Sequence, residues 1–225
     1  MYMPKASLKK ISLVGVLLFA CNAFSTVYAD IPNSIGIVTA ADFLPPPAVP
    51  GQSDWLAVPQ TQQELNLCVP TAASMVLAYF GFQYPPRQLK IWSRGLLYDP
   101  TRPFNDFTTT YFSDLLSGLQ AHGILWTNHL FSNDDSGFAN GIQQIESQLD
   151  QGLPVMVDTS LYTGHTFVVA GYDHTNGILI IRDPFIPPPG IREIKLSDFS
   201  SIWNSTRVGS NIRGAIFTAP PNLGP

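Results

Sequence analysis

The hydrophobic pattern changes its period about two thirds of the way along the chain, and this change limits the folds that the sequence can adopt. Up to residue 150, apolar residues recur with helical spacing, and glycines follow the expected helix ends. From residue 154 onwards, short segments rich in β-branched residues are bounded by Gly, Pro and Asn, a pattern typical of strands. Helices that precede an antiparallel sheet predict an α+β fold, with one long helix packed on the sheet.

The positions of the elements follow from the same pattern. We expect helices at about 70–80, 87–93, 108–121 and 138–150, strands at 154–160, 165–172, 177–184, 191–196 and 213–219, and a short helix containing Leu196, Phe199 and Trp203. The segment "TNHLF" around His129 is compatible with a loop or a strand. The helix that begins near Pro70 is apolar on nearly all sides and should therefore be buried.

The N-terminal 29 residues have the features of a signal peptide. Residues 1–10 contain three lysines and no acidic residue, and the apolar run that follows is too short to span a bilayer. The small-residue sequence "VYA" precedes Asp30, as at a cleavage site. A second interpretation is a lipoprotein anchored through Cys21, which follows "LFA". We divide the remainder into a Pro-rich arm at 30–57 and one domain at 58–220.

Charge and hydropathy exclude several classes of partner. Loss of the signal peptide would change the net charge from −4 to −7, because it removes three lysines and no acid. No cluster of Lys and Arg remains to bind nucleic acid or an acidic membrane surface. No later apolar run is long enough to cross a bilayer. We therefore expect a protein exported to the periplasm or the medium, without an integral membrane segment in the mature chain.

Cys68 would be the single thiol of the mature chain. Exported proteins usually pair their cysteines, so a lone thiol is either an inert buried group or a reactive one. Cys68 lies directly ahead of Pro70, where the first turn of a helix presents unpaired N–H groups. These groups favour a thiolate and can also stabilise an oxyanion. Position alone leaves the inert interpretation open.

A thiol nucleophile needs a base, and His165 is the best candidate among four histidines. His122 precedes a glycine at a helix end, His129 lies in a loop or strand, and His174 falls in a turn. Capping or solvation explains each of these three. His165 instead opens a strand directly after the flexible sequence "YTG".

The register of the expected hairpin decides whether a carboxylate meets this imidazole. A hairpin centred on His174 places His165 directly opposite Asp183, and opposed residues share a face of the sheet. A two-residue turn at 176–177 would instead place Asp183 opposite Ala170. We favour the centred hairpin, in part because of the resemblance described below. Asp173 is a rival carboxylate, but it lies at the far end of the hairpin.

Four segments together resemble papain-like cysteine peptidases, and most closely the bacteriocin-processing (C39-like) family. They are "VPQTQQELNLCVPTAASMVLAYFG", "GHTFVVAGYD", "ILIIRDPF" and "IKLSDFSSIW". The resemblance implies a papain-like α+β fold with Cys68 as nucleophile, His165 as general base and acid, and Asp183 as its orienting partner. It also implies Gln62, six residues before the cysteine, as the oxyanion donor. From the residues alone, a glutamine run is more typical of a polar loop, and Gln60 and Gln63 are close competitors.

One residue departs from the family pattern. Relatives usually carry glycine directly after the cysteine, and this chain has Val69. A β-branched residue narrows the approach to the thiol and restricts the backbone, although it keeps the N–H group. The family's processing enzymes are often fused to membrane transporters, and this chain has no such segments, which argues against a role in trimming double-glycine leaders during export.

The sequence therefore predicts a secreted or periplasmic thiol hydrolase, most simply a cysteine peptidase that acts on peptides or proteins through a thioester. The same residues would serve an acyltransferase of transglutaminase type, in which an amine replaces water. A non-catalytic binding module is the third interpretation, and Val69 is the residue that favours it. None of these functions requires a metal or a cofactor, and one thiol with one catalytic histidine is a poor zinc site.

Overall fold

The change of hydrophobic period corresponds to a change from helices to strands in the structure. The structure is a computed structural model, and it describes residues 55–204 and 212–222. The expected signal peptide, its Cys21 and nearly all of the Pro-rich arm lie outside the described residues. Within the described ranges, no helix has both the length and the apolar character needed to cross a membrane.

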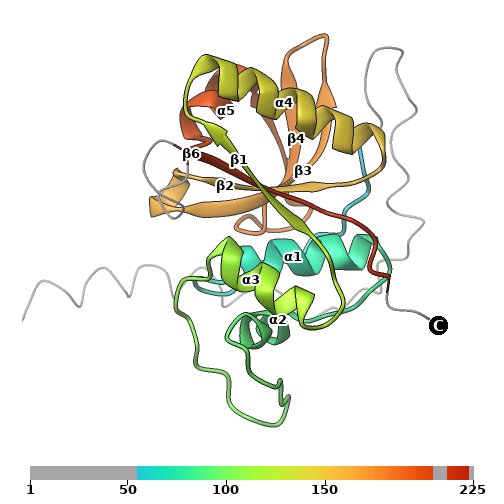
Figure 1. Cartoon of the computed structure of the whole chain (residues 1–225), viewed down its shortest axis with the longest axis vertical. Helices are drawn as coiled ribbons and strands as arrows, with labels where there is room; N and C mark the ends of the chain where they lie inside the picture. Colours follow the sequence, from blue (N-terminus) through green and yellow to red (C-terminus); the bar gives the residue numbers. More distant parts are fainter. Residues whose placement is uncertain (1–54, 205–211, 223–225) are drawn as a thin grey trace, which may run out of the picture. The chain divides into compact units, whose positions relative to one another are not determined.

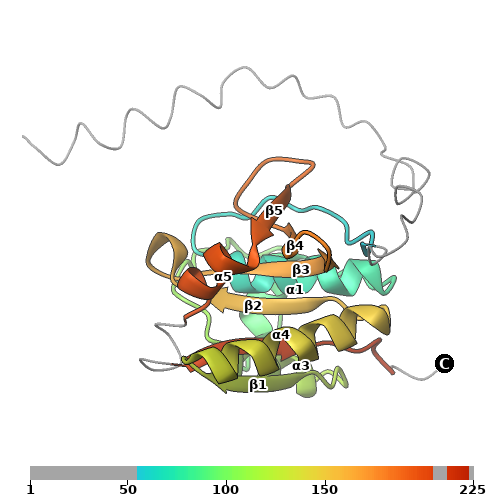
Figure 2. The ribbon, with the colours of Figure 1, turned by 90° about the horizontal axis from the view of Figure 1, so that it is seen from above.

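The described elements confirm the α+β expectation. In chain order they are α1 (Cys68–Tyr79), α2 (Pro86–Trp92), α3 (Phe112–Gln120), β1 (Thr127–Ser132), α4 (Asp135–Asp150), β2 (Val155–Thr159), β3 (His165–Asp173), β4 (Ile178–Arg182), β5 (Ile191–Lys195), α5 (Leu196–Ile202) and β6 (Ile212–Phe217). The strands form one antiparallel sheet in the order β1-β6-β2-β3-β4-β5. The segment around His129 is β1, at one edge of this sheet (Figure 2).

Helices cover both faces of the sheet. α1 packs on β3 and α3 on β1, with α2 against both helices, while α4 crosses the opposite face (Figure 1). The alternation of side chains along the strands fills both interfaces. Met156 and Val168 belong to the core on the side of α1, whereas Val157 and Phe167 belong to the core on the side of α4.

Two helices begin three or more residues away from the expected start, because side chains bind backbone groups there. α3 begins at Phe112 instead of residue 108, since Lys90 binds the backbone carbonyl of Thr108 and the hydroxyl of Thr110. α4 begins at Asp135 instead of residue 138, because the Asp134 carboxylate accepts a hydrogen bond from a first-turn N–H at 2.7 Å.

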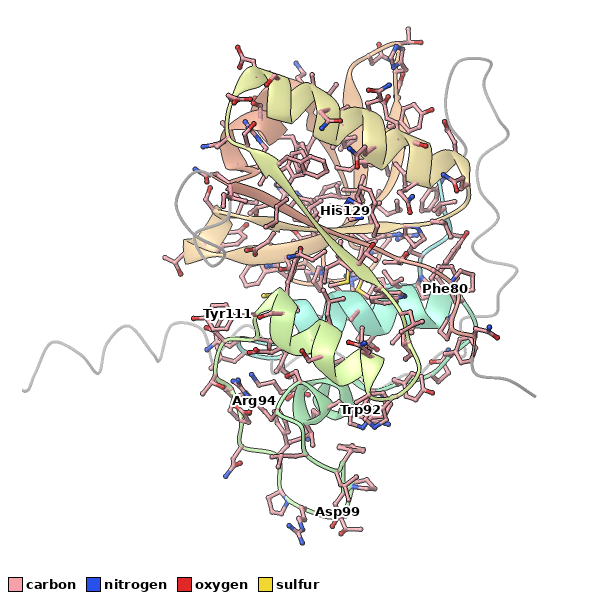
Figure 3. All side chains as sticks on the ribbon, viewed as in Figure 1. Phe80, Trp92, Arg94, Asp99, Tyr111 and His129 are labelled. Carbon is pink, nitrogen blue, oxygen red and sulfur yellow. The ribbon has the colours of Figure 1, made fainter. Side chains whose placement is uncertain are left out.

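The connection between α2 and α3 is the longest described loop in the helical half, and Asp99 lies at its far end (Figure 3). Its base is tied to the segment that precedes Cys68. Arg87 of α2 binds the Glu64 carboxylate through two nitrogens at 2.8 Å each, and Asn66 donates to the carbonyl of Phe107 at 2.9 Å. These hydrogen bonds therefore hold the segment that leads into α1.

Candidate active site

Cys68 is the first residue of α1, and only 4% of its surface is exposed. Leu67 precedes it as the N-cap and offers no side-chain hydrogen bond, so no side chain caps the first-turn N–H groups. Pro70 has no N–H of its own and is tolerated in this turn. The sulfur therefore lies at the positive end of a 12-residue helix, where an anion is stabilised.

His165 is the first residue of β3 and is almost fully buried. Its Nε2 lies 2.7 Å from Oδ1 of Asp183, and its side chain also forms a hydrogen bond with Cys68. Since Asp183 occupies Nε2, Nδ1 is the ring nitrogen left for the sulfur. The structure thus brings together the thiol, the imidazole and the carboxylate that the sequence analysis selected.

The charge of the imidazole is stabilised by its two partners. Burial alone would lower the pKa of His165, but the hydrogen bonds to Asp183 and Cys68, and the negative charges of both, raise that pKa to about 9. Burial would likewise raise the pKa of Asp183, but His165 and the other donors to the carboxylate lower it below 3.8. The site therefore favours a protonated imidazole beside the Asp183 carboxylate near neutral pH.

The pairing of His165 with Asp183 arises from a different register than either one considered from sequence. Tyr172 pairs with Leu179 near the turn, whereas Val168 pairs with Arg182 beyond it, because a β-bulge shifts the register by one residue. Continued to Asp183, the shifted register places the carboxylate level with residue 167. The expectation of direct opposition was therefore wrong, and so was the alternative.

The bulge is what allows the two side chains to meet. With the register found near the turn, His165 and Asp183 would point to opposite faces, since side chains alternate along a strand. The shift by one residue places them on the same face as diagonal neighbours, a separation that long or aromatic side chains bridge. The 2.7 Å contact depends on this irregularity.

The N-terminal end of the described chain stabilises the bulge. Ala170 is the extra residue, and its carbonyl accepts a hydrogen bond from the N–H of Leu56 at 2.6 Å. Trp55 packs so closely on Gly171 that a Cβ there would lie 2.7 Å from the Cβ of Trp55. Residues 55–57, which we assigned to the arm, therefore contribute to the geometry of the site.

Two further groups hold the Asp183 carboxylate, and sequence reasoning missed both. Nη1 of Arg192, on β5, donates to Oδ2 at 3.1 Å, and the N–H of Phe185 donates to Oδ1 at 2.9 Å. Together with His165, these two groups give the Asp183 carboxylate three hydrogen-bond donors. No local sequence pattern indicated that Arg192 binds Asp183, because this contact depends on the pairing of β5 with β4.

The three glutamines before Cys68 have different surroundings. Nε2 of Gln60 donates to the backbone carbonyls of Asp183 and Ile186 at 2.8 and 3.1 Å, so its amide hydrogens are already used. Gln63 is half-buried, and its N–H donates to the carbonyl of residue 184 at 2.7 Å. Gln62 is exposed. Its role as oxyanion donor remains a prediction.

The other histidines and the rival carboxylate lie away from this site. His122 stacks on Trp92 and binds a helix carbonyl, while His129 stacks on Phe217. His174 is exposed, with Glu146 at 3.7 Å. The Asp173 carboxylate closes the hairpin turn by binding residue 176. The contact of His122 at a helix end and the exposure of His174 agree with the capping and solvation expected, whereas the stacking of His129 was not expected.

Val69 points away from solvent. Only 1% of its surface is exposed, and it belongs to the core on the side of α1, together with Ala72 and Val76. A β-branched side chain is therefore accommodated here by core packing.

One cavity lies away from these residues. This cavity has a volume of about 760 Å³ and lies between α2 and the loop that follows it. Its lining includes Arg87, Leu97, Tyr98 and Phe104, but neither cysteine nor histidine. Within the described ranges, no group of three or more His, Cys, Asp or Glu side chains is arranged to hold a metal ion. The reactive groups gather instead at Cys68.

Solved structures similar to this chain include a peptidase domain, a double-glycine-motif protease and a cysteine protease, all of low identity. The peptidase domain of Streptococcus ComA, a bifunctional ABC transporter of a quorum-sensing pathway, has 21% identity and a TM-score of 0.49, with 72% of this chain and 96% of that chain covered. A double-glycine-motif protease from an AMS/PCAT transporter, solved with its leader peptide, has 16% identity and a TM-score of 0.47, with 75% and 95% covered. Xylellain, a cysteine protease from Xylella fastidiosa, has 12% identity and a TM-score of 0.43, with 79% and 90% covered.

Comparison with curated proteins gives no match. A comparison with protein families is decisive, because residues 55–210 match a single family over more than half of the chain. The match includes α1 with Cys68, β3 with His165, and Asp183 after β4. The chain belongs to the Peptidase C39-like family, a family of cysteine peptidases.

Proposed function

We propose that the protein is an active cysteine peptidase in which Cys68 is the nucleophile. The observation that carries this proposal is the position of His165, which forms hydrogen bonds with both Cys68 and Asp183 while almost fully buried. A raised imidazole pKa of about 9 keeps the base protonated when the sulfur is an anion. This is the resting state that thiol nucleophiles use in acyl transfer.

The reaction follows from these contacts. The sulfur of Cys68 attacks the carbonyl carbon of a peptide bond, and the negative charge that develops on oxygen is stabilised by first-turn N–H groups of α1 and by the amide of Gln62. The imidazolium of His165 donates its proton to the leaving nitrogen, and the carbon–nitrogen bond breaks. Water, deprotonated by His165, then hydrolyses the thioester. Asp183 holds the ring in orientation throughout.

The setting of the reaction follows from the sequence. We propose that residues 1–29 export the chain to the periplasm or the medium, and that peptides or proteins there are the substrates. The short distance between the basic residues of 1–10 and "VYA" supports this proposal. A cleaved N-terminus at Asp30, identified by mass spectrometry of the exported protein, is the expected result. A diacylglycerol adduct on Cys21 would show the lipoprotein instead.

The pH dependence of alkylation tests the catalytic pair directly. The chain has two cysteines, so peptide mapping after iodoacetamide treatment separates Cys68 from Cys21. We expect alkylation of Cys68 to continue well below pH 8.5, the ordinary pKa of a thiol being about 8.5. His165→Ala should restore an ordinary profile. An ordinary profile in both proteins would refute the ion pair and leave a binding domain.

A further inference from the structure

Two exposed aromatic side chains lie beside the imidazole of His165. Tyr162 is 56% exposed and Phe185 is 48% exposed, and their ring centroids are 4.8 Å apart. The centroid of the imidazole lies 5.7 Å from that of Tyr162 and 6.0 Å from that of Phe185. We call these two residues the aromatic pair. Apolar rings left in water next to a reactive group mark a binding surface.

The backbone that carries Tyr162 is fixed at both ends. Residues 160–164 join β2 to β3, and the N–H of Ser160 donates to the carbonyl of Ile202 at 2.8 Å. Tyr162 and Thr163 have φ values of 50° and 67°, in the left-handed region that residues with a Cβ rarely adopt. Backbone strain of this kind is maintained by its surroundings and is concentrated at functional sites. Here it holds the ring outside the core.

The backbone that carries Phe185 is equally constrained. Its N–H donates to the Asp183 carboxylate at 2.9 Å, and the next carbonyl, of Ile186, accepts from Gln60 at 3.1 Å. The carbonyl of Pro184 accepts from the N–H of Gln63 at 2.7 Å. The ring is thus exposed on a backbone that has little freedom to move. A preformed aromatic surface binds a ligand with a small loss of conformational entropy.

The chemistry of the site decides which half of a substrate meets this surface. The sulfur of Cys68 forms a bond to the carbonyl carbon, and the carbon–nitrogen bond breaks with its electron pair on nitrogen. The proton on His165 moves to that nitrogen, giving a thioester and a free amine. Because His165 delivers the proton, the leaving amine must lie on the imidazole side of the sulfur. The residue that carries this amine therefore lies next to the aromatic pair.

We propose that the aromatic pair is the binding subsite for the first residue after the cleaved bond, and that it selects a large apolar side chain, aromatic or branched aliphatic. This inference rests on the proposed peptidase function. The charged groups that these two residues contact, His165 and Asp183, are buried and bound to each other, and the guanidinium of Arg192 is bound to Asp183 as well. The pair therefore offers apolar ring surface and a single hydroxyl, which suits an apolar side chain and gives no partner to a charged one.

Shielding of His165 from water is the competing explanation for the same contacts. A shield would aid every acyl transfer at Cys68 to the same extent, whatever the leaving group. A subsite would aid only leaving groups that carry a side chain able to reach it. The two explanations therefore differ in the dependence of kcat/KM on the leaving group.

The test uses one acyl half with several leaving groups. A peptide cleaved by the wild-type protein is resynthesised with Phe, Leu, Gly or Asp after the cleaved bond, and its acyl half is also prepared as a methyl ester. Methanol, the leaving group of the ester, is too small to reach the aromatic pair. We expect kcat/KM for Phe or Leu to exceed that for Gly by about tenfold or more in the wild type. In Tyr162→Ala/Phe185→Ala this ratio should fall to near one, with hydrolysis of the methyl ester unchanged.

The controls separate the failure of this inference from that of the proposed function. Leu130→Ala removes a side chain that is 51% exposed on β1, at the edge strand beyond β6, and should leave the ratio unchanged. An equal loss for all peptides and for the ester would overturn the subsite and establish a shield. An unchanged ratio in the double variant would also overturn it. If the wild type cleaves nothing and Cys68 is alkylated with an ordinary pH profile, both the function and the subsite are wrong.

Discussion

Two clusters of buried charge differ in how their acceptors are arranged. At the start of β3, His165 is held between the Asp183 carboxylate and the sulfur of Cys68. Beneath the loop before α3, Lys90 is fully buried, and its ammonium donates to the carbonyl of Thr108 at 2.6 Å and to the hydroxyl of Thr110 at 2.9 Å.

Burial lowers the pKa of both cations, but their net pKa shifts have opposite directions. Burial and the positive charge of Arg94 lower the pKa of Lys90 below 10.5. The Asp106 carboxylate, at 3.8 Å, raises this pKa but does not compensate. The pKa of His165 rises to about 9, because a carboxylate and a sulfur are in direct contact with the ring. Neutral acceptors thus satisfy Lys90, whereas anions stabilise the charge of His165.

The difference shows that a buried charge does not by itself indicate a reactive site. All acceptors of Lys90 belong to residues of one loop, so this cluster fastens the loop to α2. One nitrogen of His165 is directed at a nucleophile on another layer of the fold. Substitutions in the first cluster should therefore change stability, and substitutions in the second should change catalysis.

Replacement of the nucleophile should have the largest effect on catalysis. We expect Cys68→Ala to reduce kcat/KM by at least about 1,000-fold, because no other group can form the thioester. A buried cysteine packs as a small hydrophobe, so the melting temperature measured by circular dichroism should change little. Activity that survives in the variant would assign the chemistry to a different residue.

Asp183→Asn should reduce kcat by about 100-fold or more, since the amide no longer stabilises the imidazolium. The pKa of His165, followed by NMR of the imidazole protons, should fall from about 9 towards 6.5. A variant that keeps both the rate and the raised pKa would show that Asp183 does not orient the ring.

The same substitution has a defined dependence of stability on pH. The raised pKa of His165 adds stability that is fully present below pH 6.5 and is lost as the pH rises through about 9. The lowered pKa of Asp183 adds stability above its unfolded value of 3.8, and this is lost as the pH falls through the folded pKa. The difference in free energy of unfolding between wild type and Asp183→Asn should therefore be greatest between pH 4 and 6.5.

Lys90→Met should lower stability strongly and change catalysis little. The carbonyls and hydroxyls that bind the ammonium would lose their donor, so we expect the free energy of unfolding to fall by about 3 kcal/mol. The value of kcat/KM should stay within about threefold of the wild type. Lys195→Met, at an exposed position, is the matched control. A loss of kcat as large as that of Asp183→Asn, without a loss of stability, would erase the distinction between the clusters.

Arg192 should give the smallest of these effects. Its half-exposed guanidinium adds one charge-assisted hydrogen bond to Asp183, worth ~1 kcal/mol, so Arg192→Ala should lower kcat about fivefold with KM unchanged. Arg192→Lys should restore part of this loss. A rise in KM with unchanged kcat would point to a contact with substrate instead of support for the carboxylate.

The sequence, together with its family resemblance, was sufficient to predict the fold class and the meeting of Cys68, His165 and Asp183. Cys68 at the start of a buried helix and His165 at the start of a strand are local patterns, and the structure places both as expected. The catalytic functions of these residues and of Gln62 remain predictions.

Other features depend on contacts between distant segments, which no local pattern reveals. The bulge at Ala170 requires Leu56 and Trp55, more than 100 residues earlier in the chain. Lys90 looks like an ordinary polar residue of a helix until residues 108–110 cover it. The support that Arg192 gives to Asp183 likewise follows from strand pairing alone.

The position of β6 has a consequence for the order in which the protein is assembled. β6 is the last described strand to leave the ribosome, yet it lies between β1 and β2, and β1 has no other partner in the described sheet. A chain interrupted before Ile212 would therefore leave β1 without a strand partner and without a hydrogen-bonded connection to β2. The six-stranded sheet can therefore close only after β6 has been synthesised.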